Sequence, residues 1–235
     1  MSTLTDETAT RKQQSYLVYL LVSLIFLLLF VPVFEHSSFA TSLLRIGLTA
    51  VLISAAVATQ RRRTLLILGL FVAGVAAPLS WMTMFIDQPL LFLVSCLLES
   101  TFFVVMAVMI LITVMQKHLA TVHSIFGAIS GYLLIGLAFA VLYWGLDHID
   151  PAALNFANRI TSTAVVDDKP SETAAFSQFV YFSFVTMSTL GYGDIAPRTS
   201  VAQTFAWMQS VIGQFYLAVL VAWLISEIPR RGTSD

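Results

Sequence analysis

Thr189-Leu190-Gly191-Tyr192-Gly193-Asp194 lies between an aromatic-rich apolar stretch and the last membrane-length segment of the chain. Because Gly191 and Gly193 lack a Cβ, both can adopt positive-φ conformations that most residues avoid. Successive backbone carbonyls can then point toward one axis while the intervening side chains point away. A column of closely spaced carbonyl oxygens is able to replace the water around a cation. A glycine-rich turn between two helices is the alternative interpretation.

Each residue of this stretch has an expected role. Backbone oxygens of five residues are expected to bind the ion: Thr189, Leu190, Gly191, Tyr192 and Gly193. The Thr189 hydroxyl adds an oxygen at the inner end, and the Tyr192 side chain points outward to brace the wall of the ion path. Asp194 places a carboxylate at the outer mouth.

The composition places the chain in a lipid bilayer. Hydrophobic residues make up 58% of it and charged residues only 11%, whereas charged residues approach a quarter of a soluble domain. A segment of about 20 apolar residues is needed to cross the hydrocarbon core. We therefore predict an all-α membrane protein with six transmembrane helices, at residues 16–34, 41–59, 64–86, 90–115, 124–146 and 201–226.

The first of these segments has a second interpretation. Arg11 and Lys12 precede it, as basic residues precede the apolar part of a cleaved signal peptide. Its apolar run exceeds the 7–15 residues usual for such peptides, which favours a retained span. If it were cleaved, five spans would remain.

Basic residues near the ends of the predicted spans indicate the orientation of the chain. The positive-inside rule assigns their side of the membrane to the cytoplasm, and they are Arg11, Lys12, Arg61, Arg62, Arg63, Lys117, Arg230 and Arg231. Both termini are then cytoplasmic, and residues 189–194 face outward. Acidic residues predominate on the outer side, where they either concentrate cations near a pore mouth or only solvate the loops.

Several function classes lack their signature in this chain. The single cysteine, Cys96, lies in a predicted span and allows no intrachain disulfide. The sequence has no cluster of cysteine and histidine at metal-binding spacing and no phosphate-binding loop. Its basic residues form no stripe that would bind nucleic acid. Since no nucleophile and base share a plausible depth, we do not expect an enzyme.

The segment before the motif indicates a re-entrant helix. Residues 176–187 are apolar but too few to cross a bilayer. A helix that ends just before Thr189 would direct its negative C-terminal dipole at the ion path. Farther upstream, Asp150 as N-cap and Pro151 at the first helical position predict a short helix.

One chain holds a single copy of the motif, so it cannot close a pore by itself. Rings of four such loops are needed, and a homotetramer in the lipid bilayer follows. We divide the chain into a cytoplasmic N-terminus (1–15), a four-helix peripheral domain (16–115), a cytoplasmic linker (116–123), a pore domain (124–226) and a cytoplasmic tail (227–235).

From about residue 124 onward, and most closely over residues 176–226, the chain resembles the pore module of tetrameric potassium channels. The resemblance identifies residues 189–194 as the selectivity filter, with K⁺ as the bound ion and no organic cofactor. Leu190 replaces a commoner valine, which matters little if only its carbonyl faces the ions. Val185 stands where some members carry a glutamate that pairs with the filter aspartate. Tyr181 and Phe182 fit an aromatic collar around the filter.

The resemblance also assigns residues of the last span. Gly213 coincides with a glycine at which the inner helix of some members bends, and close helix packing is the equally weighted alternative. Gln214, Leu217 and Val221 are implied to line the cavity below the filter. A buried amide facing lipid would be expensive, which favours a wet surrounding for Gln214.

With its four preceding spans the chain resembles the six-segment layout of voltage-gated channels, as a prokaryotic-type subunit, but the span in the voltage-sensor position departs from that layout. Residues 90–115 contain no arginine or lysine and one carboxylate, Glu99. Steep voltage gating uses about 3–4 charges per subunit. We therefore expect weak or absent voltage dependence. The compact loops favour the plasma membrane of a prokaryote, that is, a bacterial inner membrane.

Glu99 lies near the middle of its span, where a carboxylate costs roughly 2.5–3.5 kcal/mol. Arg45, near the outer end of the second span, is its predicted partner. A buried pair or a protonated carboxyl is one interpretation, and a proton-sensing or ligand role is the other. The alternatives at the level of function are a poorly selective cation channel of the same fold, a transporter or sensor that uses Glu99, and a non-conducting regulatory subunit.

Overall fold

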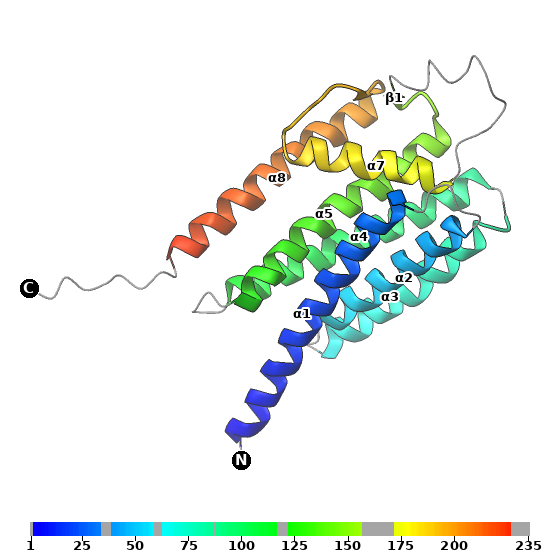
Figure 1. The fold of residues 1–235 in the computed structure, drawn as a ribbon. Helices are drawn as coiled ribbons and strands as arrows, with labels where there is room; N and C mark the ends of the chain where they lie inside the picture. The colour runs from blue at the N-terminus through cyan, green and yellow to red at the C-terminus, as the bar shows by residue number, and fades with distance from the viewer. Residues whose placement is uncertain are drawn as a thin grey trace, which may run out of the picture.

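The computed structural model describes residues 2–33, 39–58, 63–86, 88–116, 122–156 and 172–226. These residues are almost entirely helical, and Figure 1 shows long helices that run roughly side by side. The helices are α1 (Ser2–Val33), α2 (Ala40–Ala58), α3 (Arg63–Met82), α4 (Pro89–Met115), α5 (Val122–Ile149), α7 (Glu172–Met187) and α8 (Ser200–Ser226). Two short strands, β1 (Leu154–Phe156) and β2 (Ile195–Pro197), complete the fold.

Every segment predicted to be a span coincides with a helix. In the part of the chain that the structure describes, four stretches are long and apolar enough to cross a membrane: Ala40–Ala58, Pro89–Met115, Ser124–Ile149 and Ser200–Ser226. Within the described residues, α1 and α3 carry shorter apolar runs, Tyr16–Phe30 and Gly69–Met82. The structure therefore supports four spans by length and composition, and spans at α1 and α3 stay a prediction. The predicted C-terminal tail and most of the linker lie outside the described residues, whereas residues 2–15 of the predicted N-terminus are part of α1.

The α5 helix forms the centre of the molecule. In its apolar window, 72% of the residues are buried inside the chain, against 22% in α8. The neighbouring helices α1 and α4 pack along α5, and α7 crosses it near one end (Figure 1). Leu24 of α1, Phe103 of α4, Leu137 of α5 and Phe179 of α7 belong to one continuous apolar core. The predicted peripheral and pore segments thus share a core, and the less buried α8 reaches it through Ala202, Tyr216 and Trp223.

The predicted short helix after Asp150 is wrong. Asp150 does begin a turn, since its Oδ1 accepts the Ala152 N–H at 3.1 Å and its backbone oxygen accepts the Ala153 N–H at 2.8 Å. The chain then extends into β1, which pairs antiparallel with β2, Asn155 standing opposite Ala196. Leu154 and Phe156, on either side of the exposed Asn155, are buried, and their burial stabilises the strand. Tertiary pairing has overridden a local capping signal.

Candidate functional site

The α7 helix ends at Met187, as the sequence predicts, and the chain turns tightly around its C-terminus. Thr189 N donates to the Thr186 carbonyl, and Leu190 N donates to the Val185 carbonyl, both at 3.0 Å. These bonds satisfy carbonyls that the last helical turn would otherwise leave without a partner. The start of the 189–194 stretch is therefore fixed to the end of α7.

In this stretch the backbone φ angle is positive at every second residue. Thr189, Gly191 and Gly193 have φ angles of 59°, 58° and 82°. Across the described parts of the chain, Thr189 is the only residue other than glycine with a positive φ. A β-branched residue in this region is strained, and such strain gathers at functional sites. A Cβ added to Gly191 or Gly193 would meet nothing within 4 Å in this chain. Glycine is thus required there for its conformation and not for space.

The stretch is exposed to its surroundings in the single chain. Residues 188–194 are all exposed, and the side chains of Leu190 and Tyr192 are 54% and 67% exposed. Irregular backbone at membrane depth is tolerated only where protein buries it or water lines it. The described residues of one chain provide no such cover for the stretch.

Tyr181, a predicted collar residue, contacts the C-terminal end of the stretch through a hydrogen bond that the sequence alone did not indicate. Its hydroxyl donates to Asp194 Oδ2 at 2.8 Å, and its ring stacks on Tyr192 with centroids 6.4 Å apart. Val185 offers no such bond because it has no polar side-chain atom. The support expected from a glutamate at position 185 is therefore supplied by a phenol one helical turn earlier on α7.

A buried neutral network holds α7 against its neighbours, and sequence reasoning missed it too. The Gln209 amide of α8 accepts from the Tyr143 hydroxyl of α5 at 2.9 Å. It also donates to the Ser183 hydroxyl of α7 at 2.7 Å and to the Ser183 carbonyl at 3.1 Å. The Ser183 hydroxyl in turn donates to the Gly136 carbonyl at 2.6 Å. Phe182, the predicted collar residue, packs edge-on against Tyr143.

The spacing along α8 contains the signal that would have found Gln209. The buried residues of this helix form one stripe with intervals of seven, four, three and seven, and they are Ala202, Gln209, Gly213, Tyr216 and Trp223. Intervals of three, four and seven mark one helix face. A glutamine on the face that carries Gly213 indicates a buried amide with hydrogen-bond partners.

Gly213 itself faces the base of the 189–194 stretch. A Cβ there would lie 2.6 Å from the Met187 backbone oxygen and 2.8 Å from the Met187 Cγ. This contact favours the packing interpretation of Gly213. The predicted cavity residues Gln214, Leu217 and Val221 are exposed in the single chain. Neighbouring α8 residues such as Phe215 are exposed as well, and the cavity role of the three stays a prediction.

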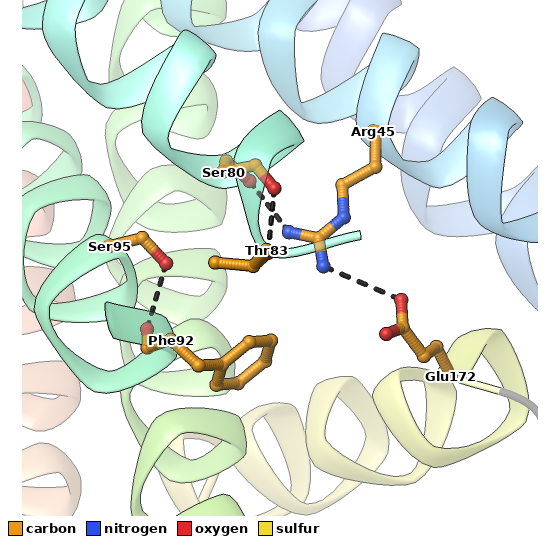
Figure 2. A network of polar contacts seen from close by, with 6 residues as sticks. All are labelled: Arg45, Ser80, Thr83, Phe92, Ser95 and Glu172. Atoms are coloured by element: carbon orange, nitrogen blue, oxygen red, sulfur yellow. Dashed lines mark hydrogen bonds and ion pairs between the residues drawn. The ribbon is translucent and has the colours of Figure 1, made fainter. Parts of the chain in front are cut away.

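The predicted direct pairing of Arg45 with Glu99 is not the ion pair that the structure contains. Arg45 Nη2 contacts Glu172 Oε2 at 3.4 Å, and Arg45 Nη1 donates to the Ser80 hydroxyl at 2.6 Å (Figure 2). Glu99 is buried close by and interacts with Ser80 and with the charge of Arg45, but its Oε1 has no hydrogen-bond partner among the described residues. Ser80 holds one arm of the guanidinium, and Glu172 attracts the other.

Comparison with known proteins agrees with this geometry. Residues 152–228 match the family model described as "Ion channel", which spans β1, α7, the 189–194 stretch and α8. The chain therefore contains an ion channel domain in an apolar, largely helical protein. This match covers about a third of the chain.

Two curated relatives from Arabidopsis thaliana match part of the same region. Two-pore potassium channel 3 is 37% identical over 49 residues, which is 21% of this chain and 11% of the relative. Two-pore potassium channel 4 is 38% identical over 58 residues, which is 25% of this chain and 20% of the relative. The chain thus covers a fifth or less of either relative. No solved structure matches it.

Proposed function

We propose that this chain is a subunit of a potassium-selective channel that lets K⁺ cross the membrane passively. Four copies surround one axis, and the backbone oxygens of the filter (residues 189–193) bind the ions. The proposal is carried by the alternation of positive φ at Thr189, Gly191 and Gly193, directly after a helix that ends at Met187. Such an alternation is a way for one short strand to present consecutive carbonyls to one side.

The electrostatics of α7 support a cation at this place. A helix C-terminus carries about half a negative charge. The filter begins two residues after Met187, so this charge lies next to the proposed ion path. Four such helices around an axis offset part of the cost of removing a cation from water. No enzymatic step and no organic cofactor belong to this function.

The bare filter supports the homotetramer. Its exposed, irregular backbone cannot face lipid, and copies of the same chain around a water-filled axis would cover it. The poorly buried α8, with Trp207 and Phe215 exposed, offers apolar surface to neighbouring copies. Closed rings of identical subunits are the usual way to satisfy such surfaces.

The choice of potassium rests on the sequence of the filter and on the relatives. Both are named potassium channels, and the proposal carries only their ion to this chain. Purified protein in liposomes, measured with opposed K⁺ and Na⁺ gradients, tests it. We expect a reversal potential near that of potassium. Equal permeation of both ions would indicate a poorly selective cation channel instead, and no flux would favour a regulatory subunit or a role centred on Glu99.

Two glycine variants test whether conduction depends on the positive φ at Gly191. Gly191→Ala places a Cβ in open space at a φ of 58°, and Gly74→Ala of α3 places one in equally open space within a helix. We expect Gly191→Ala to abolish selective K⁺ flux and Gly74→Ala to retain it. If both variants conduct selectively, the positive φ at Gly191 is not needed for conduction.

Voltage dependence is proposed to be weak. The α4 helix carries Glu99 and no basic residue. Each elementary charge that crosses the membrane contributes about 2.3 kcal/mol per 100 mV, and gating charges of this kind are missing from α4. Current recordings from −100 to +100 mV are expected to show a nearly constant open probability. A tenfold rise over a few tens of millivolts would contradict the proposal.

The proposed topology has six spans, both termini in the cytoplasm and the filter facing outward, with a bacterial inner membrane as the setting. A cysteine introduced at Asp150 should then react with an impermeant thiol reagent added outside the cell. The native Cys96 is buried and serves as a silent background. Labelling from the cytoplasmic side alone would show that the chain has the opposite orientation.

A further inference from the structure

Arg45, on α2, lies where helices α3, α4 and α5 meet the N-terminal end of α7. It is only 2% exposed and is contacted from four other helices. Ser80 of α3 and Glu172 of α7 contact its two terminal nitrogens (Figure 2). The rings of Phe92 on α4 and Trp144 on α5 lie 5.9 Å and 5.1 Å from its Cζ. A single guanidinium on α2 therefore joins elements from most of the fold.

The position of this cation is unfavourable for α7 unless Glu172 is present. The N-terminus of a helix carries about half a positive charge, and Arg45 is held near the first turn of α7 by Ser80 and two aromatic rings. Glu172, which is the first residue of α7, places a carboxylate at this point. The Glu172 carboxylate thereby replaces the repulsion between the Arg45 guanidinium and the positive end of the α7 dipole with an attraction. The sign of the force on this end of α7 thus depends on one side chain.

Apolar packing does not explain the cluster. Arg45 Nε and Glu99 Oε1 are buried and lack hydrogen-bond partners in the described parts of the chain. Apolar residues of similar volume often replace buried charges without loss of stability. A charged residue that is only partly satisfied at this junction therefore points to a role other than stability.

The geometry of α7 would transmit a shift at Glu172 to the filter. Ser183 is fixed by the neutral network with Gln209 and Gly136, and it acts as a pivot. Glu172 lies about 16 Å from this pivot along the helix, and Met187 lies about 6 Å from it on the other side. A displacement of about 1.5 Å at Glu172 then moves Met187 by about 0.6 Å. Functional sites of this kind tolerate errors of only about 0.5 Å.

We propose that Arg45 is a positioning residue through which helices α2 to α4 hold the N-terminal end of α7, and with it the filter, in the conducting position. This inference rests on the proposed channel function. Glu172 is its partner on α7, and Ser80 fixes the direction of the guanidinium. Arg45 contacts no ion.

The test uses the full chain in liposomes and compares Glu172→Gln with Asp150→Asn. Each variant removes one exposed or half-exposed carboxylate. Among the described residues the Asp150 side chain bonds within its own turn, and the asparagine of Asp150→Asn keeps the oxygen that accepts from Ala152. We expect Glu172→Gln to lower K⁺ flux per assembled protein at least tenfold and Asp150→Asn to change it less than twofold. Glu172→Asp, which keeps the charge, should restore at least a third of the flux.

Three outcomes overturn the inference. If Glu172→Gln conducts within twofold of the wild type, Glu172 does not couple to the filter. If Asp150→Asn loses as much K⁺ flux as Glu172→Gln, the loss is due to surface charge. If Glu172→Gln fails to assemble, Ser80→Ala decides, because it leaves the ion pair and removes the other anchor of Arg45. We expect a two- to fivefold loss of flux in Ser80→Ala, and unchanged flux overturns the inference.

A second measurement separates this inference from the proposed function. Hydrogen–deuterium exchange of the peptide that spans α7 and the filter does not require conduction. We expect faster exchange in Glu172→Gln and wild-type exchange in Asp150→Asn. A wild-type protein that carries no K⁺ while showing this pattern would defeat the channel proposal alone. Unchanged exchange in Glu172→Gln would defeat the positioning role alone.

Discussion

Two buried polar networks hold α7, and they are built in opposite ways. The network at the middle of the helix is neutral, and Gln209, Tyr143 and Ser183 connect through bonds of 2.6–3.1 Å. The network at the N-terminal end is charged, with a 3.4 Å ion pair between Arg45 and Glu172, and among the described residues Arg45 Nε and Glu99 Oε1 have no hydrogen-bond partner. The first has the features of a fixed attachment, and the second has those of an adjustable one.

The difference follows from the low dielectric of the interior. A neutral donor and acceptor that meet there are rigid and cost little, whereas a partly paired charge remains expensive. Loss of the neutral network should therefore reduce stability more than activity. Loss of the charged network should do the reverse. The variants below test this contrast in descending order of their expected effect on the free energy of unfolding.

Gly213→Ala should have the largest effect, because it forces apart the two helices that the neutral network joins. The added Cβ meets the Met187 backbone oxygen, which cannot rotate away. Overpacking of this kind costs about 1–3 kcal/mol, and we expect a value near the upper end in chemical denaturation of the detergent-solubilised protein. Gly74→Ala is the control and should not destabilise. A normal stability with altered open probability would instead favour the hinge interpretation of Gly213.

Gln209→Leu should cost about 2 kcal/mol, since it leaves the buried Tyr143 hydroxyl without its acceptor. Selectivity of any protein that still assembles should stay close to that of the wild type. Gln203→Leu is the matched control, because Gln203 is exposed on the same helix and its side-chain amide donates to the Pro197 and Arg198 carbonyls at 3.4 and 3.3 Å. Denaturation curves of both variants provide the measurement. Equal losses in the two would mean that burial of the amide is unimportant.

Arg45→Met, made in a Glu99→Gln background so that no buried carboxylate loses its cation, should cost only about 1 kcal/mol relative to that background, although it removes a fully buried charge. Methionine fills much of the same volume, and Glu172, whose side chain is 43% exposed, can regain water. K⁺ flux per assembled protein should nevertheless fall at least tenfold. Denaturation and liposome flux on the same preparation check both numbers. A stability loss greater than that of Gln209→Leu would break the contrast between the two networks.

Tyr181→Phe should have the smallest effect on stability, less than about 0.5 kcal/mol, because its hydroxyl bond to Asp194 is exposed. Its effect should be seen in the filter, as a two- to fivefold change in the rate at which current declines during sustained conduction. Tyr19→Phe, at an exposed position of α1, is the control. Identical current decline in both variants would show that the bond does not support the filter.

The sequence was sufficient for the parts of the fold that depend on local pattern. Runs of apolar residues located the helices, and the motif after Met187 located the end of α7. The peculiar backbone of residues 189–193 could also be predicted, since glycines at alternate positions permit it. These features depend on neighbours within one or two helical turns.

The features that could not be predicted all join distant residues. Arg45 and Glu172 are 127 positions apart, and Tyr143 and Gln209 are 66 apart. The sequence identified Arg45 and Glu99 as unusual but could not choose among the carboxylates within reach of Arg45. It also gave no sign of β1 and β2, because three-residue strands carry too little pattern and exist only through their pairing.

That pairing gives the filter segment a property of its own. The Leu154–Phe156 and Ile195–Pro197 strands hold together the two ends of a loop of about 40 residues that contains α7 and the filter. Once such a loop is closed, its ends no longer have to find each other, and the entropy cost of closure has already been met. Transient loosening of the filter would thus leave both ends clamped, and recovery would be a local rearrangement instead of a search by a free chain.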